Sequence, residues 1–101
     1  MTLAYVSGGS NLDAEANLKL AARALRGRHP GTRFSSCYRN PAIGFEGPDF
    51  INFVAEVPVR GDPQLLKGEL ECIETQCGRP REAPKWAPRA MDLDILLFGA
   101  R

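Results

Sequence analysis

One segment of this chain alternates so regularly that it restricts the folds open to it. From residue 51 to residue 59 every second residue is apolar, and this series consists of Ile51, Phe53, Ala55, Val57 and Val59. Because successive side chains of a strand point to opposite faces of a sheet, the pattern predicts a strand with one buried face. The other face would carry Phe50, Asn52, Val54 and Glu56. We therefore expect a sheet that packs one of its faces into a core.

Two further segments have the apolar spacing of amphipathic helices. The apolar positions of the first are Leu18, Ala21, Ala22 and Leu25. We expect Ser10 or Asn11 to cap this helix, and Gly27 with the turn at 29–31 to end it. His29, in that turn, is expected to be exposed. The second helix is expected to begin with Asp62 as its cap and Pro63 at its first position, and to end at Gly78. Its apolar stripe consists of Leu66, Leu70, Ile73 and Cys77.

Three more strands are expected over residues 3–6, 33–39 and 92–98. The segment Ser7-Gly8-Gly9-Ser10-Asn11 between the first strand and the first helix could bind phosphate at the helix N-terminus. It matches no glycine-rich phosphate motif, however, which favours a structural tight turn. The order of elements predicts an α+β fold, a ferredoxin-like βαββαβ sandwich with both helices on one face of an antiparallel sheet. With 101 residues, the chain is expected to form a single domain over residues 1–101.

The composition excludes several classes of function. The net charge is +1, from 13 basic and 12 acidic residues, which is low for a nucleic-acid-binding protein. No segment resembles a membrane span or a signal peptide. The three cysteines have no CxxC spacing, so reduced thiols in the cytoplasm are expected rather than disulfides or a zinc site.

The motif Asp92-Leu93-Asp94 at the start of the last expected strand is a candidate metal site. Residues two apart on a strand point to the same side, so the two carboxylates could bind one cation. Oxygen ligands favour Mg²⁺, which takes its remaining ligands from water and from substrate phosphates. The alternative is that both aspartates are merely solvated at a strand edge.

Positive charge lies just before this motif, at Arg79, Arg81, Lys85 and Arg89. Arginines match phosphate with paired donors, so this loop could bind a polyphosphate, although it could also be an ordinary exposed loop. Trp86 lies within it and offers either a stacking surface for a flat heterocycle or a lid on the core. Asn52 and Phe50 on the open face could bind such a heterocycle too.

With these motifs in view, the chain resembles the 6-hydroxymethyl-7,8-dihydropterin pyrophosphokinase family of folate biosynthesis. Three segments carry the resemblance: Gly9-Ser10-Asn11-Leu12, Pro48-Asp49-Phe50-Ile51-Asn52, and Gly78-Arg79-Pro80-Arg81 continuing through Trp86-Ala87-Pro88-Arg89 to Asp92-Leu93-Asp94 and Gly99. The match is collinear along the chain. It implies an ATP- and Mg²⁺-dependent enzyme that transfers pyrophosphate from ATP to the pterin and releases AMP.

The resemblance also implies roles for individual residues. Asp92 and Asp94 match the ligands of the magnesium, expected as two ions, and act in catalysis together with Arg81 and Arg89. The positions that match nucleotide contacts are Glu74, Arg81, Trp86, Arg89 and Ile95. The positions that match pterin contacts are Asn40, Pro41, Ile43, Phe50, Asn52 and Trp86.

The chain also departs from the family pattern. From the resemblance we expect a short form that lacks the C-terminal third usual in members, whether the chain is naturally short, truncated or a degenerate relative. Gly8 stands where an apolar residue is usual, which predicts weaker packing there. The alternative function is therefore a short homologue that binds pterin or nucleotide with little or no turnover and needs a missing lid or a partner. A homo-oligomer or partner chain could cover the open side, whereas nucleic acid and membrane are not expected partners.

Overall fold

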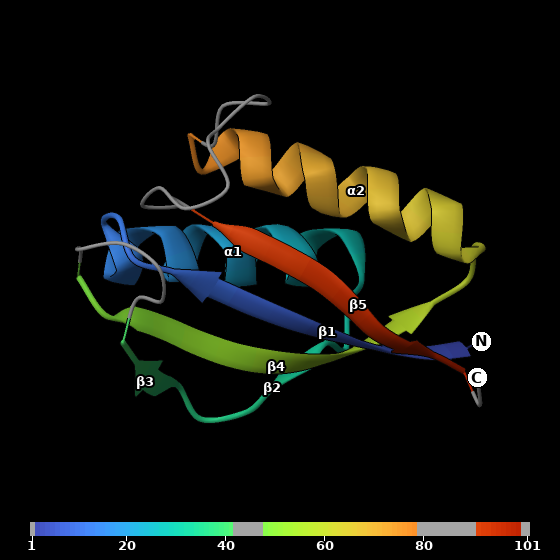
Figure 1. Ribbon diagram of the computed structural model, residues 1–101. Coiled ribbons are helices and arrows are strands. Elements are labelled where there is room, and N and C mark those ends of the chain that lie inside the picture. The colour runs from blue at the N-terminus through green and yellow to red at the C-terminus, as the bar shows by residue number, and fades with distance from the viewer. Residues whose placement is uncertain (1, 42–47, 79–90, 100–101) are drawn as a thin grey trace.

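An antiparallel sheet with two helices on one face makes up the part of the chain that the computed structural model describes, residues 2–41, 48–78 and 91–99 (Figure 1). The elements follow the order β1 (Thr2–Ser10), α1 (Ala14–Arg28), β2 (Arg33–Phe34), β3 (Tyr38–Asn40), β4 (Phe50–Val59), α2 (Pro63–Gln76) and β5 (Asp92–Phe98). Neither helix has the length and apolar character needed to cross a membrane.

The strand order confirms the expected ferredoxin-like topology. The sheet runs β2-β4-β1-β5, and β3 pairs with the same strand as β2, further along β4. Every pairing is antiparallel. β1 and β4 therefore lie in the centre, and β5, which carries Asp92 and Asp94, lies at an edge.

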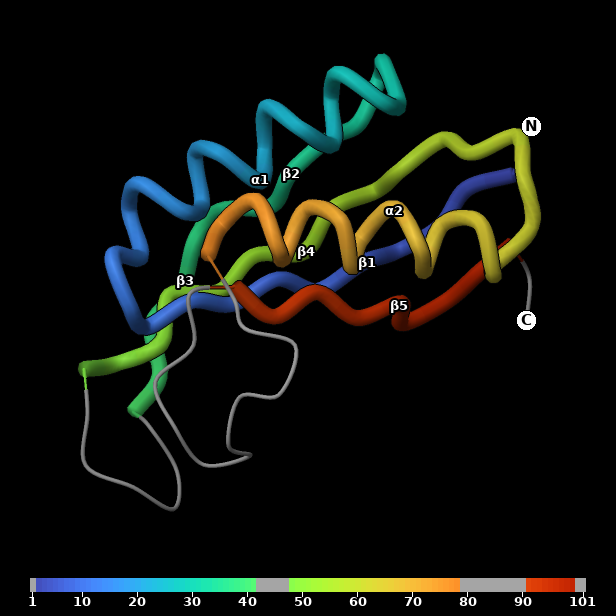
Figure 2. The backbone as a smooth tube through the Cα atoms, turned by 90° about the horizontal axis from the view of Figure 1, so that it is seen from above, coloured from blue at the N-terminus to red at the C-terminus, as the bar shows by residue number. Residues whose placement is uncertain are grey.

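Both helices cover the same face of the sheet, as expected. Figure 2 shows α1 and α2 side by side above the strands, with α2 over the β5 side. The core between the two layers is apolar, and its large fully buried side chains include Val6, Leu25, Val57, Leu66, Ile73 and Met91. No helix of the described residues covers the other face of the sheet.

The strand β4 confirms the alternation in the sequence. Phe53, Ala55, Val57 and Val59 are buried, while the residues between them are half-buried. The predicted second helix is also confirmed at its start, where the Leu65 backbone N–H donates to the Asp62 carboxylate at 2.9 Å. Pro63 follows as the first helical residue. Both predictions rested on local rules, and neighbouring elements did not override them.

The expected turn after residue 6 is wrong, because β1 continues to Ser10. Its pairing with β4 extends this far, from Thr2 opposite Val59 to Ser10 opposite Ile51. Neither Ser10 nor Asn11 caps α1. That position belongs to Asp13, whose φ of 48° is left-handed and whose side chain accepts no capping bond. Long-range pairing therefore decided a boundary that local turn signals misplaced.

The strand expected over 33–39 is interrupted and forms two short strands, β2 and β3. At the interruption, the Ser35 backbone N–H donates to the Val54 carbonyl, whereas the Val54 N–H donates to the Ser35 hydroxyl at 2.9 Å. A side chain thus replaces a backbone carbonyl in the ladder. Asn40, one residue beyond the expected strand, is the last residue of β3.

His29 is less exposed than expected, since only 14% of its side chain is accessible. Its Nε2 lies 2.8 Å from a carboxylate oxygen of Glu69 in α2, and Arg28 lies 3.8 Å from the other oxygen. These two contacts tie the end of α1 to α2. Gly27 does not end α1, which continues to Arg28.

Candidate functional site

Three strands bring the predicted site residues together on the face of the sheet that the helices leave uncovered. Gly9 of β1 pairs with Asn52 of β4 on one side and with Asp92 of β5 on the other. Two residues earlier on β1, Ser7 pairs with Val54 and with Asp94. Residues directly opposite one another in an antiparallel pair point to the same face. The amide of Asn52 and both carboxylates therefore lie on one surface, about two strand spacings apart.

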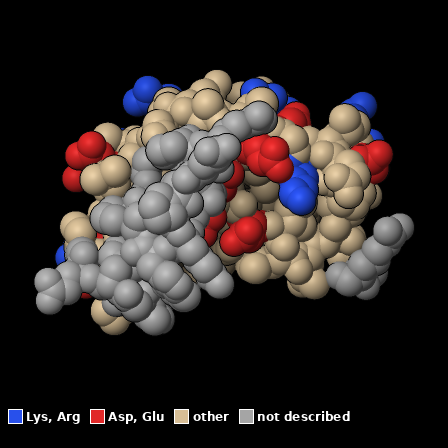
Figure 3. Space-filling model, turned by 45° about the horizontal axis from the view of Figure 1, so that its top comes forward, with Lys and Arg blue, Asp and Glu red and all other residues tan. Residues whose placement is uncertain are grey.

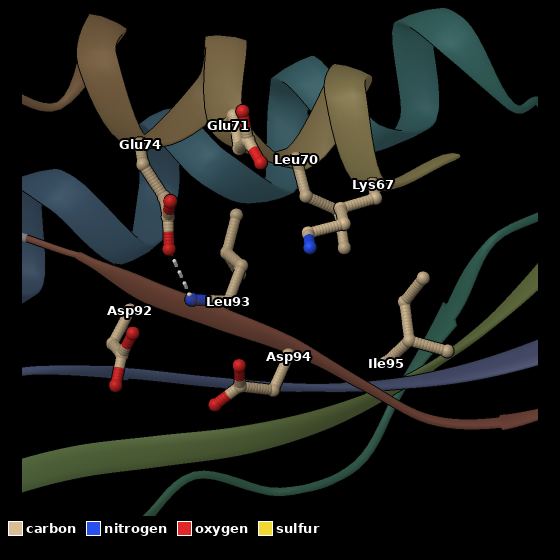
Figure 4. A pocket seen from close by; sticks show the side chains of 8 residues that line it. All are labelled: Lys67, Leu70, Glu71, Glu74, Asp92, Leu93, Asp94 and Ile95. Atoms are coloured by element: carbon tan, nitrogen blue, oxygen red, sulfur yellow. Dashed lines mark hydrogen bonds between the residues drawn. The ribbon is translucent and has the colours of Figure 1, made fainter. Parts of the chain in front are cut away.

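Asp92 and Asp94 lie on the same side of β5, as the sequence predicted (Figure 4). Leu93 between them points to the opposite side, where it is buried. Asp92 is half-buried, and Asp94 is exposed. This arrangement suits a cation that takes some of its ligands from solvent or from a bound phosphate.

The two carboxylates fit a magnesium ion that also binds water or phosphate better than they fit a metal ion whose ligands all come from the protein. Among the described residues, no group of three His, Cys, Asp or Glu side chains is placed to hold a metal ion. Two carboxylates without nitrogen or sulfur ligands are what Mg²⁺ commonly uses beside substrate phosphates. The magnesium ligands therefore stay a prediction that the geometry permits.

On the β4 side, Gly9 makes room for Asn52. A Cβ atom on Gly9 would lie 2.5 Å from the Asn52 amide oxygen, so any larger residue would displace this side chain. The Asn52 amide nitrogen donates to the Asn40 side-chain oxygen across β3 and β4. Phe50 lies on the same face, two residues before Asn52. The predicted pterin residues Asn40, Phe50 and Asn52 are thus neighbours on one surface.

Asn11 was not among the predicted site residues, although it positions one of the predicted segments. Its side chain is buried, and its amide nitrogen donates to the Pro48 carbonyl at 3.1 Å. Pro48 directly precedes the segment that leads into Phe50 and β4. Gly9 and Asn11 both belong to the first segment of the family resemblance, and that was the one signal for them in the sequence.

A pocket of about 350 Å³ lies between α2 and the outer edge of β5 (Figure 4). Its volume falls in the range typical of small-ligand sites. The residues that line it are Lys67, Leu70, Glu71 and Glu74 from α2, and Asp92, Leu93, Asp94 and Ile95 from β5. It therefore joins the aspartate pair to Glu74 and Ile95, the two described residues predicted to contact a nucleotide.

Glu74 also fixes the edge strand. Its carboxylate accepts a hydrogen bond of 2.8 Å from the Leu93 backbone N–H, which the neighbouring strand β1 does not use. A charge-assisted bond to an edge N–H stabilises the spacing between α2 and β5. It thus joins α2 to β5 within the lining of the pocket.

Among the described residues that line the pocket, four of the five charged side chains are carboxylates. Figure 3 shows acidic side chains gathered on this part of the surface. Cys77 follows α2. Burial raises the pKa of its thiol, and the negative charge of the nearby Glu74 carboxylate raises it further. Cys77 therefore stays protonated and is not a candidate nucleophile.

Four predicted site residues, Ile43, Arg81, Trp86 and Arg89, lie outside the described residues, so their predicted roles stay predictions. Pro41 is exposed directly after β3. The structure thus brings together the acidic pair, the Asn40–Asn52 pair and the pocket with Glu74 and Ile95.

Comparison with known proteins points in one direction. The family model for 7,8-dihydro-6-hydroxymethylpterin-pyrophosphokinase matches residues 5–101. The chain is similar to the 2-amino-4-hydroxy-6-hydroxymethyldihydropteridine pyrophosphokinase of Bacillus subtilis, with 39% identity over 95% of this chain and 59% of the relative. The enzyme of the same name from Haemophilus influenzae is 36% identical over 98% of this chain and 64% of its own length. A third, from Pseudomonas putida, is 36% identical, and the match covers 81% of it. The chain thus spans about three fifths of the length of the first two relatives.

Proposed function

Because this chain belongs to the 7,8-dihydro-6-hydroxymethylpterin-pyrophosphokinase family, we propose that it transfers pyrophosphate from ATP to 6-hydroxymethyl-7,8-dihydropterin and releases AMP. One observation carries the proposal. The carboxylates of Asp92 and Asp94 share a face with Asn52, and they also border the pocket beneath α2. A phosphate-binding metal pair would then lie between a heterocycle site and a nucleotide site, which is the order that this transfer requires.

The nucleotide is proposed to enter the pocket between α2 and β5. Glu74 and Ile95 would contact it there, while Arg81, Trp86 and Arg89 would complete its binding and offset phosphate charge. Asp92 and Asp94 would hold Mg²⁺, proposed as two ions. When bound, Mg²⁺ neutralises phosphate charge and orients the phosphates for in-line displacement.

The pterin is proposed to lie on the open face of the sheet. Asn52, fixed by its bond to Asn40, offers an amide edge that can pair with a heterocycle. Phe50 offers a surface for stacking, and Pro41, Ile43 and Trp86 would complete the site. Gly9 keeps the surface beside Asn52 flat enough for a ring to approach.

In the proposed reaction, the hydroxymethyl oxygen forms a bond to the β-phosphorus of ATP. The bond between that phosphorus and the oxygen bridging to the α-phosphorus breaks, and AMP leaves with this oxygen. Asp94, the more exposed carboxylate of the pair, would take the proton of the attacking hydroxyl. Positioning and charge compensation supply the rate enhancement, as is general for phosphoryl transfer.

The surroundings of the reaction are proposals as well. We place it in the cytoplasm, in agreement with three cysteines that are free thiols. We also propose that a second copy of the chain or a partner chain covers the open face of the sheet.

The test is AMP formation from ATP and 6-hydroxymethyl-7,8-dihydropterin, with and without Mg²⁺. We expect metal-dependent AMP from the wild type and a loss of at least about 100-fold in the double variant Asp92→Asn, Asp94→Asn, which keeps the side-chain shape. Glu15→Gln, at an exposed carboxylate of α1, is the matched control and should retain full activity. The absence of AMP from folded wild-type protein would refute the enzyme. Titration of pterin against the fluorescence of Trp86, the single tryptophan, would then test the alternative of binding without turnover.

A further inference from the structure

The pocket beneath α2 has two ends that differ in chemistry. α2 and β5 run in opposite directions, so Glu74 lies near Asp92 and Lys67 lies toward Ile95 (Figure 4). Glu74 and Lys67 are seven residues apart, about 10 Å along the helix axis. Asp92 and Ile95 are three residues apart, about 10 Å along the strand. The Lys67 end is therefore about 10 Å from the end where phosphates would meet the aspartate pair.

Lys67 is chemically distinct from the rest of this lining. The other ionisable residues of the lining are carboxylates: Glu71, Glu74, Asp92 and Asp94. Carboxylates accept hydrogen bonds, whereas an ammonium group only donates them. Among the described residues that line the pocket, Lys67 is thus the one side chain that can donate with a charge. Figure 4 shows its ammonium group directed toward the space between α2 and β5.

The ammonium group of Lys67 is not occupied by an ion pair with a described residue, although Glu71 follows it by one helical turn. The same two residue types form an ion pair of 3.3 Å on α1, between Glu15 and Lys19. The order explains the difference, since glutamate before lysine at this spacing is the more favourable orientation. On α2 lysine comes first, which leaves its ammonium group available to a ligand.

We propose that Lys67 is a nucleotide-binding residue that donates a hydrogen bond to the nucleoside portion of the nucleotide. This inference rests on the proposed function, since it takes the pocket to be the nucleotide site. If phosphates lie at the aspartate end, the base and ribose extend about 10 Å along the pocket to Lys67. Base-ring nitrogens and ribose oxygens accept hydrogen bonds, which the carboxylates around them cannot donate.

The experiment compares Lys67→Met with Lys19→Met. The control removes a lysine of α1 that, like Lys67, lies four residues from a glutamate on its own helix. Binding of ATP, AMP and adenosine is measured by calorimetry. Because Lys67 contacts the nucleoside, Lys67→Met should weaken all three by about tenfold, the size expected for one charge-assisted bond. Lys67→Arg retains a charged donor and should restore most of the affinity. Lys19→Met should leave all three affinities at the wild-type value.

Pterin binding, followed by Trp86 fluorescence, should be unchanged in Lys67→Met. Unchanged affinities for ATP, AMP and adenosine in this variant would overturn the inference and leave the proposed function intact. Weaker binding of ATP and AMP together with an unchanged affinity for adenosine would overturn the inference as well, because the ammonium group would then contact phosphate. Wild-type protein that binds pterin but no nucleotide would overturn both the inference and the proposed transfer.

Discussion

Gly8 and Gly9 are neighbours on β1, yet they make room on opposite faces of the same sheet. A Cβ atom on Gly8 would enter the Phe53 ring and approach the Leu93 side chain to 3.0 Å, in the core. A Cβ atom on Gly9 would meet the Asn52 amide on the open face. Both glycines admit a side chain from β4, but Phe53 packs in the core, whereas Asn52 lies at the proposed pterin site. Gly8 is therefore expected to affect mainly stability, and Gly9 mainly ligand binding.

The expectation that Gly8 weakens local packing is therefore wrong. Phe53 is 3% exposed, and its ring occupies the space that a side chain at position 8 would fill. The ring also packs edge-to-face on Phe34 of β2, with centroids 5.6 Å apart. Such aromatic pairs add stability beyond buried area. The glycine on β1 thus allows a larger residue on β4 to complete the core.

The largest effect is expected for Gly8→Ala. The added methyl group meets a buried ring that has no free space to enter, so the free energy of unfolding should fall by about 2–3 kcal/mol. Urea denaturation followed by circular dichroism measures this loss. Phe53→Leu in the same chain removes the ring edge, and the double variant should lose less than the two single variants together. Strict additivity would contradict the packing explanation.

An intermediate effect is expected for the same substitution one residue later, Gly9→Ala. The half-buried Asn52 can rotate away and give up its bond to Asn40, so the free energy of unfolding should fall by less than about 1 kcal/mol. Pterin affinity should instead fall by about tenfold, because the amide no longer lies where the heterocycle is proposed to meet it. Fluorescence titration of pterin measures the affinity. A large loss of stability with normal pterin binding would reverse the assigned difference between the two faces.

The smallest effect is expected for Tyr5→Phe, further along the open face. The Tyr5 hydroxyl donates to the Glu56 carboxylate at 3.1 Å. This bond, followed by the charge of Glu56, raises the pKa of Tyr5 above its ordinary value of 10.0. The folded state therefore retains a proton that the unfolded state loses first, and the stabilisation decreases as the pH rises from 10 through the raised pKa.

Urea midpoints of wild type and Tyr5→Phe between pH 8 and 11 test this expectation. Their difference should be small and constant at pH 8 and 9, and should shrink above pH 10. A difference that stays constant over the whole range would show that the hydroxyl contributes nothing through its proton. Tyr5 lies away from the row of Asn52, Gly9 and Asp92, so pterin binding should not change in this variant.

Some of the fold was predictable because it depends on local rules. The alternation in β4 and the Asp62–Pro63 start of α2 each concern residues close in sequence, and both predictions were confirmed. The interruption between β2 and β3 was not predictable in the same way. It depends on the Ser35 hydroxyl accepting from Val54, a residue 19 positions away.

Some features of the candidate site also follow from local sequence, whereas others depend on long-range contacts. That Asp92 and Asp94 share a side of a strand follows from their spacing, and the structure confirms it. The bond from Asn11 to Pro48 joins residues 37 positions apart, and no local pattern indicates it. Glu74 was expected through the family resemblance, but its bond to the Leu93 N–H depends on where α2 lies over β5.

The sequence by itself determined the type and order of the elements, because alternation, helical spacing and capping act over a few residues. The sequence also determined that the carboxylates of Asp92 and Asp94 lie on the same side of one strand, because the two residues are two positions apart. Only the tertiary structure decided that Asn52, Gly9 and Asp92 share one row of the sheet. The register of three whole strands sets that row, and a slip of one residue would turn each side chain to the other face. The site therefore depends on strand pairing over more than 80 residues of chain, which no local segment encodes.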